Sequence, residues 1–185
     1  MSEHIEIAHN LLPAIAYGDA AGLPFEAQPP QDEGALDGLR DTETNPFIGK
    51  YSAGTWSDDT HLSLAVAKSV IETGGFDLES QAQWHVDAFV HVIGGGNNPD
   101  MVPPVVTTGV QTGWGQSTTK SVERLRDGIS PRTSGAPQGA GNGVLMKMAP
   151  LVLWQLGDRV QTSEAEQQLI ELTEMTHGAP EAKVA

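Results

Sequence analysis

The sequence predicts an all-α fold, a compact set of helices joined by glycine-rich loops. Apolar residues recur at helical spacing in several segments, and the run 105–108 is the only candidate strand. No internal repeat and no break in composition divides the 185 residues. A chain of this length can bury a core of its own, so we expect one domain over residues 1–185.

The first expected helix covers residues 4–17, where Pro13 lacks an amide hydrogen and should bend or shorten it. Residues 27–55 hold adjacent prolines, glycines and acids without periodicity, which predicts a long loop of the kind that usually carries function. Apolar residues then return at helical spacing from Thr60 to the glycine pair 74–75, which should end the second helix. Its expected buried face comprises Leu62, Ala65, Val66, Ser69 and Val70.

The second half of the chain predicts further helices. One is expected over residues 78–92, another after an N-cap at Ser117, and a third over 142–154. Ser163 and Glu166 have the spacing of a capping box, in which each side chain bonds the other residue's amide. This pair should open a last long helix.

The charge of the chain limits its partners. There are 24 Asp and Glu residues against 10 Lys and Arg, a formal net charge of -14, which repels nucleic acids and anionic membranes. We expect neither as a partner, and an anionic ligand would have to be bound locally, through amides or cations. The absence of cysteine excludes thiolate chemistry. Without a signal sequence or a long apolar run, a cytoplasmic location is expected.

Ser57, Asp58 and Asp59 form a candidate metal site. Two carboxylates about 4 Å apart repel by roughly 4 kcal/mol at an effective dielectric of 20, and a cation would remove that cost. The alternative is a helix start, with Ser57 as N-cap and both acids in the first turn pointing to solvent. Spacing alone favours the helix start, whereas the hydroxyl and carboxylate oxygens suit a hard cation such as Mg²⁺.

Two other segments could bind a ligand. Residues 135–143 are glycine-rich and precede an apolar run, so their amides could approach an anion, although a plain flexible connection is equally consistent. At residues 18–26, Asp19 is expected to cap or brace a turn. Glu26 could be a desolvated acid/base group, but surface solvation is the simpler interpretation.

The histidines show no metal-ligand spacing. We expect most of the six to be ordinary surface or half-buried residues. His177 differs in its neighbours, because the run 175–180 places its imidazole at the end of a helix.

These segments, in this order, resemble the ADP-ribosylglycohydrolase family over nearly the whole chain. GDAAGLPFE at 18–26 is similar to the first family motif, and GTWSDDT at 54–60 to its metal motif. GAGNG at 139–143 resembles the ligand-binding glycine segment. Thr-His at 176–177, followed by Pro180, resembles a Thr-His motif.

The resemblance implies an all-α hydrolase in which two Mg²⁺ ions hold the distal ribose of ADP-ribose and activate a water molecule. The expected substrate is an ADP-ribosylated protein or a small molecule that contains ADP-ribose. Carried over, the metal ligands are Ser57, Asp58 and Asp59, the catalytic residues are Glu26, Asp58 and Asp59, and the substrate-binding residues are Gly141, Asn142, Gly143 and His177.

The chain departs from the family pattern in three places. Ser57 stands where threonine is usual, and Ala179 where a second histidine is common. The later Asp-x-Asp-Thr segment that completes the metal site would lie beyond Ala185, and the helix begun at Pro180 stops without a cap. We therefore expect a C-terminally truncated front portion with weak or absent metal occupancy.

Two alternatives remain. The chain could be a non-catalytic relative, either an ADP-ribose-binding module or a crystallin-like structural protein. It could also be a different Mg²⁺-dependent hydrolase, acting on a phosphoester or another ribosyl compound.

Overall fold

The computed structural model describes residues 2–27, 38–42, 51–94 and 114–183, and the regular elements among these residues are helices, with no strand. The all-α prediction is confirmed. Parts of the predicted loop 27–55, most of the turn at 94–99 and the candidate strand at 105–108 lie outside the described residues. The helices are α1 (Ser2–Gly22), α2 (Asp58–Thr73), α3 (Leu78–Gly94), α4 (Gln116–Arg126), α5 (Ala149–Asp158) and α6 (Thr162–Glu174), with 3-10 turns η1 (Leu23–Phe25), η3 (Asn142–Lys147) and η4 (Pro180–Lys183).

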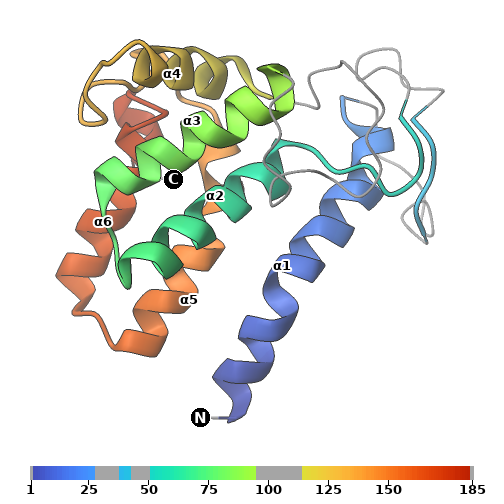
Figure 1. Ribbon diagram of the computed structural model, residues 1–185, viewed down its shortest axis with the longest axis horizontal. Helices are drawn as coiled ribbons and strands as arrows, with labels where there is room; N and C mark the ends of the chain where they lie inside the picture. Colours follow the sequence, from blue (N-terminus) through green and yellow to red (C-terminus); the bar gives the residue numbers. More distant parts are fainter. Residues whose placement is uncertain (1, 28–37, 43–50, 95–113, 184–185) are drawn as a thin grey trace.

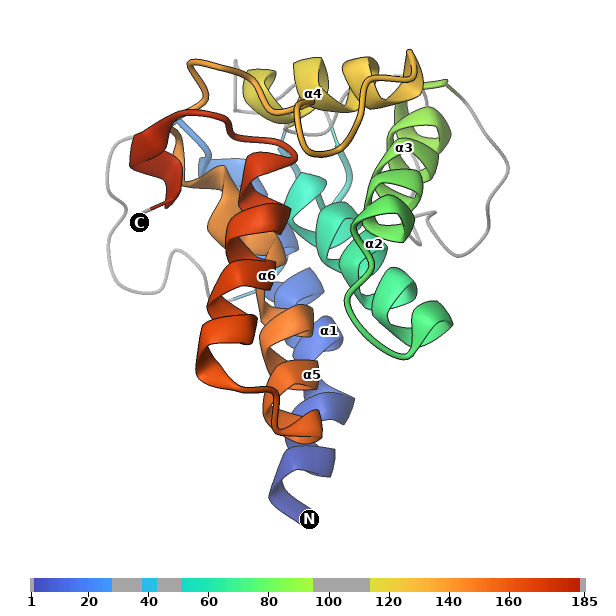
Figure 2. The same ribbon diagram turned by 90° about the vertical axis from the view of Figure 1, so that its left-hand side faces the viewer.

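Helix α2 is the centre of the arrangement, because α1, α3, α5 and η3 all pack against it. Figure 1 shows α2 between α3 on one side and α1 and α5 on the other. Helix α4 lies across one end of the molecule, and the N-terminus of α1 lies at the opposite end in both views (Figures 1 and 2). No helix in the described part of the chain is long and apolar enough to cross a membrane.

Helix α2 buries the face that its periodicity predicts. Two apolar clusters meet on it: Val66 and Val70 pack with residues of α3, α5 and α6, and Leu62 and Ala65 pack with residues of α3 and α4. The helix ends at Gly74, which adopts a left-handed conformation with φ of 70° that a side chain would strain. The predicted terminator is therefore confirmed. The buried residues of the predicted face are Leu62, Ala65, Val66, Ser69 and Val70.

Helix α1 is longer than predicted, since it continues through Pro13 to Gly22. A proline inside a helix costs about 3 kcal/mol because it removes a hydrogen bond and crowds the preceding turn. Packing of α1 against α2 and α5 offsets this cost. Of the two predicted effects of Pro13, shortening of the helix is wrong, and bending stays a prediction.

Two predicted N-caps are also wrong. Helix α4 begins at Gln116 with Gly115 as its N-cap, and α6 begins at Thr162 with Gln161 as its N-cap, so neither serine caps a helix. The short connection from α5 sets the start of α6. Arg159 adopts a left-handed conformation, and the amide of Val160 bonds back into α5, so the chain re-enters a helix before the predicted capping box. Ser117 and Ser163 both lie inside the first turns of their helices.

The helix predicted over 142–154 is in fact two elements, η3 and α5. Pro150 has no amide hydrogen, so it cannot bond to the carbonyl oxygen of Met146 as a continuous α-helix requires. That oxygen instead accepts the hydroxyl hydrogen of Ser63 in α2 at 3.0 Å. Pro150 therefore interrupts the helix, and a side chain of α2 satisfies the carbonyl oxygen that the proline leaves without a helical partner.

Leu151 tests the core. It is 0% exposed in the cluster of α2, α3, α5 and α6, whereas Leu156 on the same helix is 62% exposed. We expect Leu151→Ala to lower the free energy of unfolding by about 2–5 kcal/mol, because a cavity adds to the lost burial. Leu156→Ala should change it by less than about 0.5 kcal/mol. Urea denaturation measures both, and equal effects would contradict the core assignment.

Candidate functional site

Asp19, near the end of α1, caps the first turn of α2. One carboxylate oxygen, Oδ2, accepts the amide hydrogens of Ser57 at 2.8 Å and Thr60 at 3.1 Å, and the hydroxyl hydrogen of Thr60 at 2.6 Å. The other, Oδ1, accepts the hydroxyl hydrogen of Ser57 at 2.7 Å. Ser57 is the N-cap residue of α2 but makes no capping bond with its own side chain. Asp19 therefore caps the N-terminus of α2 from another helix, in agreement with its predicted structural role.

Asp58 begins α2 and is 5% exposed. Its Oδ2 accepts the amide hydrogen of Gly115 at 3.3 Å. Burial and then the charge of Asp59 raise the pKa of Asp58 to about 8. The interpretation in which both acids point to solvent is therefore wrong for Asp58, because its carboxyl group faces the interior and its ionised form needs a compensating charge.

Asp59 and Glu26 belong to the same acidic cluster. Asp59 is half-buried, and burial and then the charge of Asp19 raise its pKa. Glu26 follows η1 and is exposed by its surface area, as the simpler interpretation expects. Even so, partial burial and then the charges of Asp59 and Asp19 raise its pKa. The loop after α1 thus brings a third predicted catalytic residue within electrostatic range of α2.

The donors at the start of α2 fit Mg²⁺, which prefers oxygen ligands. Because Ser57 directs its hydroxyl hydrogen to Asp19, the lone pairs of its oxygen are left for a cation. A divalent cation would also relieve the repulsion that raises the pKa values of Asp58 and Asp59. Within the described ranges, no group of three or more His, Cys, Asp or Glu side chains is arranged to hold a metal ion. The described residues therefore offer few metal ligands.

The predicted glycine segment leads from α4 into η3. Gly141 is the N-cap of η3 in an extended conformation, and both Gly141 and Asn142 are exposed. Because η3 is a 3-10 helix of six residues, the long helix dipole expected behind these glycines is absent. Ligand contacts here would come from individual amides and short side chains.

His177 lies beside this glycine segment, just after the end of α6. Ala136 and His177 form an isolated parallel β-bridge, in which the amide of Ala136 bonds the carbonyl of Thr176 at 3.2 Å and the amide of Gly178 bonds that of Ala136 at 2.9 Å. A Cβ atom added to Gly143 would lie 3.9 Å from Nε2 of His177. The fold thus places two predicted substrate-binding residues side by side.

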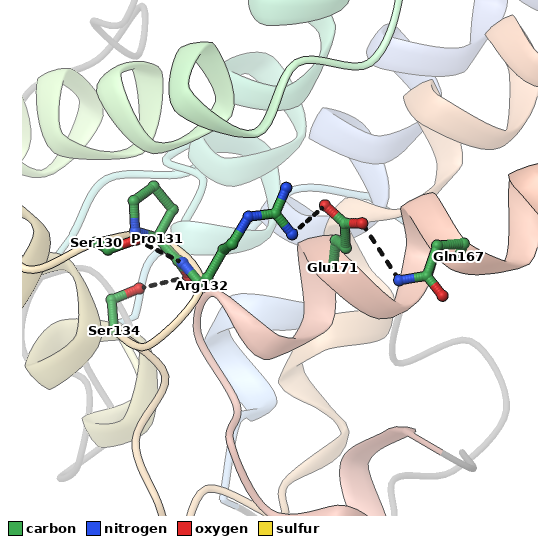
Figure 3. A network of polar contacts seen from close by, with 6 residues as sticks. All are labelled: Ser130, Pro131, Arg132, Ser134, Gln167 and Glu171. Carbon is green, nitrogen blue, oxygen red and sulfur yellow. Dashed lines mark hydrogen bonds and ion pairs between the residues drawn. The ribbon is translucent and has the colours of Figure 1, made fainter.

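A polar network fixes the turn that enters the β-bridge (Figure 3). Arg132 forms an ion pair with Glu171 of α6 at 3.2 Å, and Glu171 also accepts a hydrogen bond from Gln167. The buried Ser134 donates its hydroxyl hydrogen to the carbonyl oxygen of Met175 at 2.8 Å. Since Arg132 is largely exposed, its ion pair contributes little free energy, and the buried serine bond is the firmer link between the turn and the end of α6.

The predicted metal and glycine segments are joined through α2. Helix α2 packs against η3, and Ser63, one turn after Asp59, donates its hydroxyl hydrogen to the carbonyl oxygen of Met146. The acidic cluster is therefore held on the same helix that supports the glycine segment.

A buried basic group, which was not predicted, lies behind the glycine segment. Lys147 of η3 is 1% exposed, and burial lowers its pKa to about 7. The expectation that most of the six histidines are surface or half-buried residues is also wrong, because four of them are buried: His61, His85, His91 and His177. The position of Lys147 between Met146 and Met148 in an apolar run was the available signal.

Residues 4–185 match the sequence profile described as ADP-ribosylglycohydrolase. The chain belongs to the ADP-ribosylglycohydrolase family. It is 28% identical over 178 residues to ADP-ribosylarginine hydrolase Tri1 of Pseudomonas putida (strain GB-1), and 27% identical over 183 residues to the Tri1 of Serratia proteamaculans (strain 568). It also shares its fold with a chain of a solved structure, an ADP-ribosylglycohydrolase-related protein complex, with a TM-score of 0.70 and 23% identity.

The matches differ in how much of each protein they cover. They include 96% and 98% of this chain but only 43% and 44% of the two Tri1 proteins. The solved structure matches 100% of this chain over 53% of its own length. The chain therefore spans less than half the length of the two Tri1 relatives.

Gly135 tests the close packing at the β-bridge. A Cβ atom there would lie 2.0 Å from the carbonyl oxygen of Glu174, so the backbone would have to move. We expect Gly135→Ala to lower the free energy of unfolding by about 2 kcal/mol or more. Gly157→Ala, at a helical position with no atom within 4 Å, should instead raise it by up to about 1 kcal/mol. Thermal unfolding of both variants measures the difference, and a Gly135→Ala variant as stable as the parent would refute it.

The raised pKa of Asp58 should make the free energy of unfolding of the metal-free protein depend on pH. Because its folded-state pKa rises from 3.8 to about 8, the stability that the protonated carboxyl provides should be lost as pH rises through this window. Asp58→Asn cannot ionise, so at pH 8 we expect it to raise the free energy of unfolding by at least about 1.4 kcal/mol, the equivalent of one pKa unit.

Melting curves from pH 5 to pH 8.5 in a metal chelator measure the Asp58 effect. Asp158→Asn removes the same charge from an exposed site at the end of α5 and serves as the control. Parallel stability profiles for the parent protein and Asp58→Asn would contradict the prediction.

Proposed function

We propose that this chain supplies the Mg²⁺-binding and ADP-ribose-binding portion of an enzyme that hydrolyses ADP-ribosyl linkages and releases ADP-ribose. Family membership and the printed names of the two Tri1 relatives support the reaction class. The observation that carries the proposal is the buried carboxyl of Asp58, which lies next to Asp59 and Ser57 at the start of a helix packed against the glycine segment.

Ser57, Asp58 and Asp59 would hold Mg²⁺ in this proposal. The ion would supply charge neutralisation, orientation of the ribose hydroxyls and polarisation of water. Asp19 orients the hydroxyl of Ser57 and holds the first turn of α2, so the oxygen of Ser57 would keep its orientation without a ligand. Asp19 would thus act as the support behind the ligand set.

Glu26 would serve as the acid/base group near the leaving group. Its raised pKa increases the fraction that is protonated near neutral pH, which suits a general acid for a glycosidic bond. Its exposure makes it accessible to a substrate attached to a protein surface.

Gly141, Asn142, Gly143 and His177 would contact the nucleotide part of the ligand. The exposed backbone at Gly141 and Asn142 gives a diphosphate or ribose close access to amide groups. This mode of binding suits a chain with a net charge of -14, since it does not need a basic surface.

The substrate class we favour is an ADP-ribosylated arginine in a protein, because both Tri1 relatives are named ADP-ribosylarginine hydrolases. A second candidate function is binding of ADP-ribose without turnover. It is favoured by the small number of metal donors among the described residues.

Calorimetry with ADP-ribose tests the proposal on the 185-residue chain. Binding is expected in the presence of Mg²⁺ and should weaken at least about tenfold in a chelator. Asp58→Asn and Asp59→Asn should weaken it similarly in Mg²⁺, whereas Asp158→Asn, with the same change in charge, should not.

A parallel assay distinguishes the two candidate functions by measuring ADP-ribose released from an ADP-ribosylarginine protein. Release that depends on Mg²⁺ and Asp59 supports hydrolysis, and binding without release supports the second candidate. No binding of ADP-ribose in either condition would overturn both.

A further inference from the structure

Lys147 is the centre of a buried chain of hydrogen bonds behind the glycine segment. Its Nζ atom lies 3.3 Å from Nε2 of His85 in α3 and 2.9 Å from Oγ1 of Thr176. Thr176 Oγ1 lies 3.0 Å from Nδ1 of His177. All four side chains are buried, and no step of the proposed hydrolysis uses Lys147, His85 or Thr176.

The donors and acceptors in this series of hydrogen bonds can be assigned starting from His85. Its Nδ1 lies 2.7 Å from the carbonyl oxygen of Gln81, which can only accept, so Nδ1 carries the hydrogen. Burial and then the charge of Lys147 lower the pKa of His85 and keep its ring neutral. Nε2 of His85 is therefore an acceptor, and Lys147 donates to it.

Thr176 links the hydrogen bond from Lys147 to His177. Its oxygen accepts a hydrogen from Lys147, which leaves the single hydroxyl hydrogen of Thr176 to be placed. A buried hydroxyl hydrogen needs an acceptor, and Nδ1 of His177 is within reach. With Nδ1 as acceptor and burial lowering the pKa of His177 to about 4, the neutral ring carries its hydrogen on Nε2.

We propose that Lys147 is a positioning residue which, through Thr176, fixes His177 as an Nε2–H hydrogen-bond donor directed at an acceptor oxygen of the ligand beside Gly143. The orientation follows from the closeness of Nε2 of His177 to Gly143. The identity of the ligand as ADP-ribose rests on the proposed function, whereas the tautomer of His177 does not.

The cost of burying Lys147 supports a role of this kind. A fully buried amine loses its hydration, and an apolar side chain of similar size would fill the site at lower cost. Lys147 has two oriented acceptors, one on α3 and one after α6, which a methionine could not bind. The residue therefore fixes hydrogen-bond direction.

The first test is the tautomer of His177 in the unmodified chain. Long-range ¹H–¹⁵N correlation spectra at pH 6, below the pKa of about 7 of Lys147 and above that of about 4 of His177, distinguish the two ring nitrogens. Signals are assigned from His177→Gln and His85→Gln. We expect His177 to carry its hydrogen on Nε2 and His85 on Nδ1. A hydrogen on Nδ1 of His177 would overturn the proposal.

The second test alters the link to Lys147. Thr176→Val removes the hydroxyl at nearly constant volume, and Lys147→Met removes the donor, so in both variants His177 should show a mixture of tautomers. Thr176→Ser and Lys147→Arg keep the donors and should restore the Nε2–H form at least in part. A His177 spectrum that Thr176→Val and Lys147→Met leave unchanged, in variants with native melting, would overturn the proposal.

Binding of ADP-ribose separates this inference from the proposed function. Thr176→Val and Lys147→Met are expected to weaken binding about tenfold, as the loss of one oriented donor predicts. If the unmodified chain shows the expected tautomers but binds no ADP-ribose, the proposed function fails and the positioning of His177 stands. If the unmodified chain binds ADP-ribose with His177 in the other tautomer, the positioning of His177 fails and the proposed function stands.

Discussion

The carboxylate of Asp19 is the interaction on which the rest of the site depends. It holds the amides and hydroxyls of Ser57 and Thr60, and so joins the end of α1 to the start of α2. This contact decides where α2 begins and therefore which way Asp58 and Asp59 face. It also leaves the oxygen of Ser57 with free lone pairs. A serine that capped its own helix would direct its oxygen to the backbone instead.

Several different partners offset the cost of burying the neighbouring carboxylates of the acidic cluster. The N-terminus of α2 is the positive end of the helix dipole and offsets part of the repulsion between Asp58 and Asp59. The amide of Gly115 stabilises the ionised form of Asp58, and the backbone amide of Asp59 stabilises the ionised form of its own side chain. These contacts reduce the upward shifts of pKa but do not cancel them, so the ionised cluster keeps a repulsion that a nearby positive charge would relieve.

The parts of the fold that follow local rules could be predicted from the sequence. The buried face of α2 follows from helical spacing and its end from Gly74, because these features depend on residues near one another. The starts of α4 and α6 could not be predicted, since short connections rather than the nearest serines set them. The family motifs indicated His177 and the glycine segment, but Lys147 and His85, which are 62 residues apart, meet only through packing.

The hydrogen bonds of the site differ from those of the helices in sequence separation. Asp19 and Thr60 are 41 residues apart, Ser63 and Met146 are 83 apart, and Lys147 and Thr176 are 29 apart. Closing such long loops costs chain entropy before any contact repays it, whereas helical turns form locally. The site therefore depends on tertiary packing, and a chain in which only the local helical turns had formed would not bring these groups together.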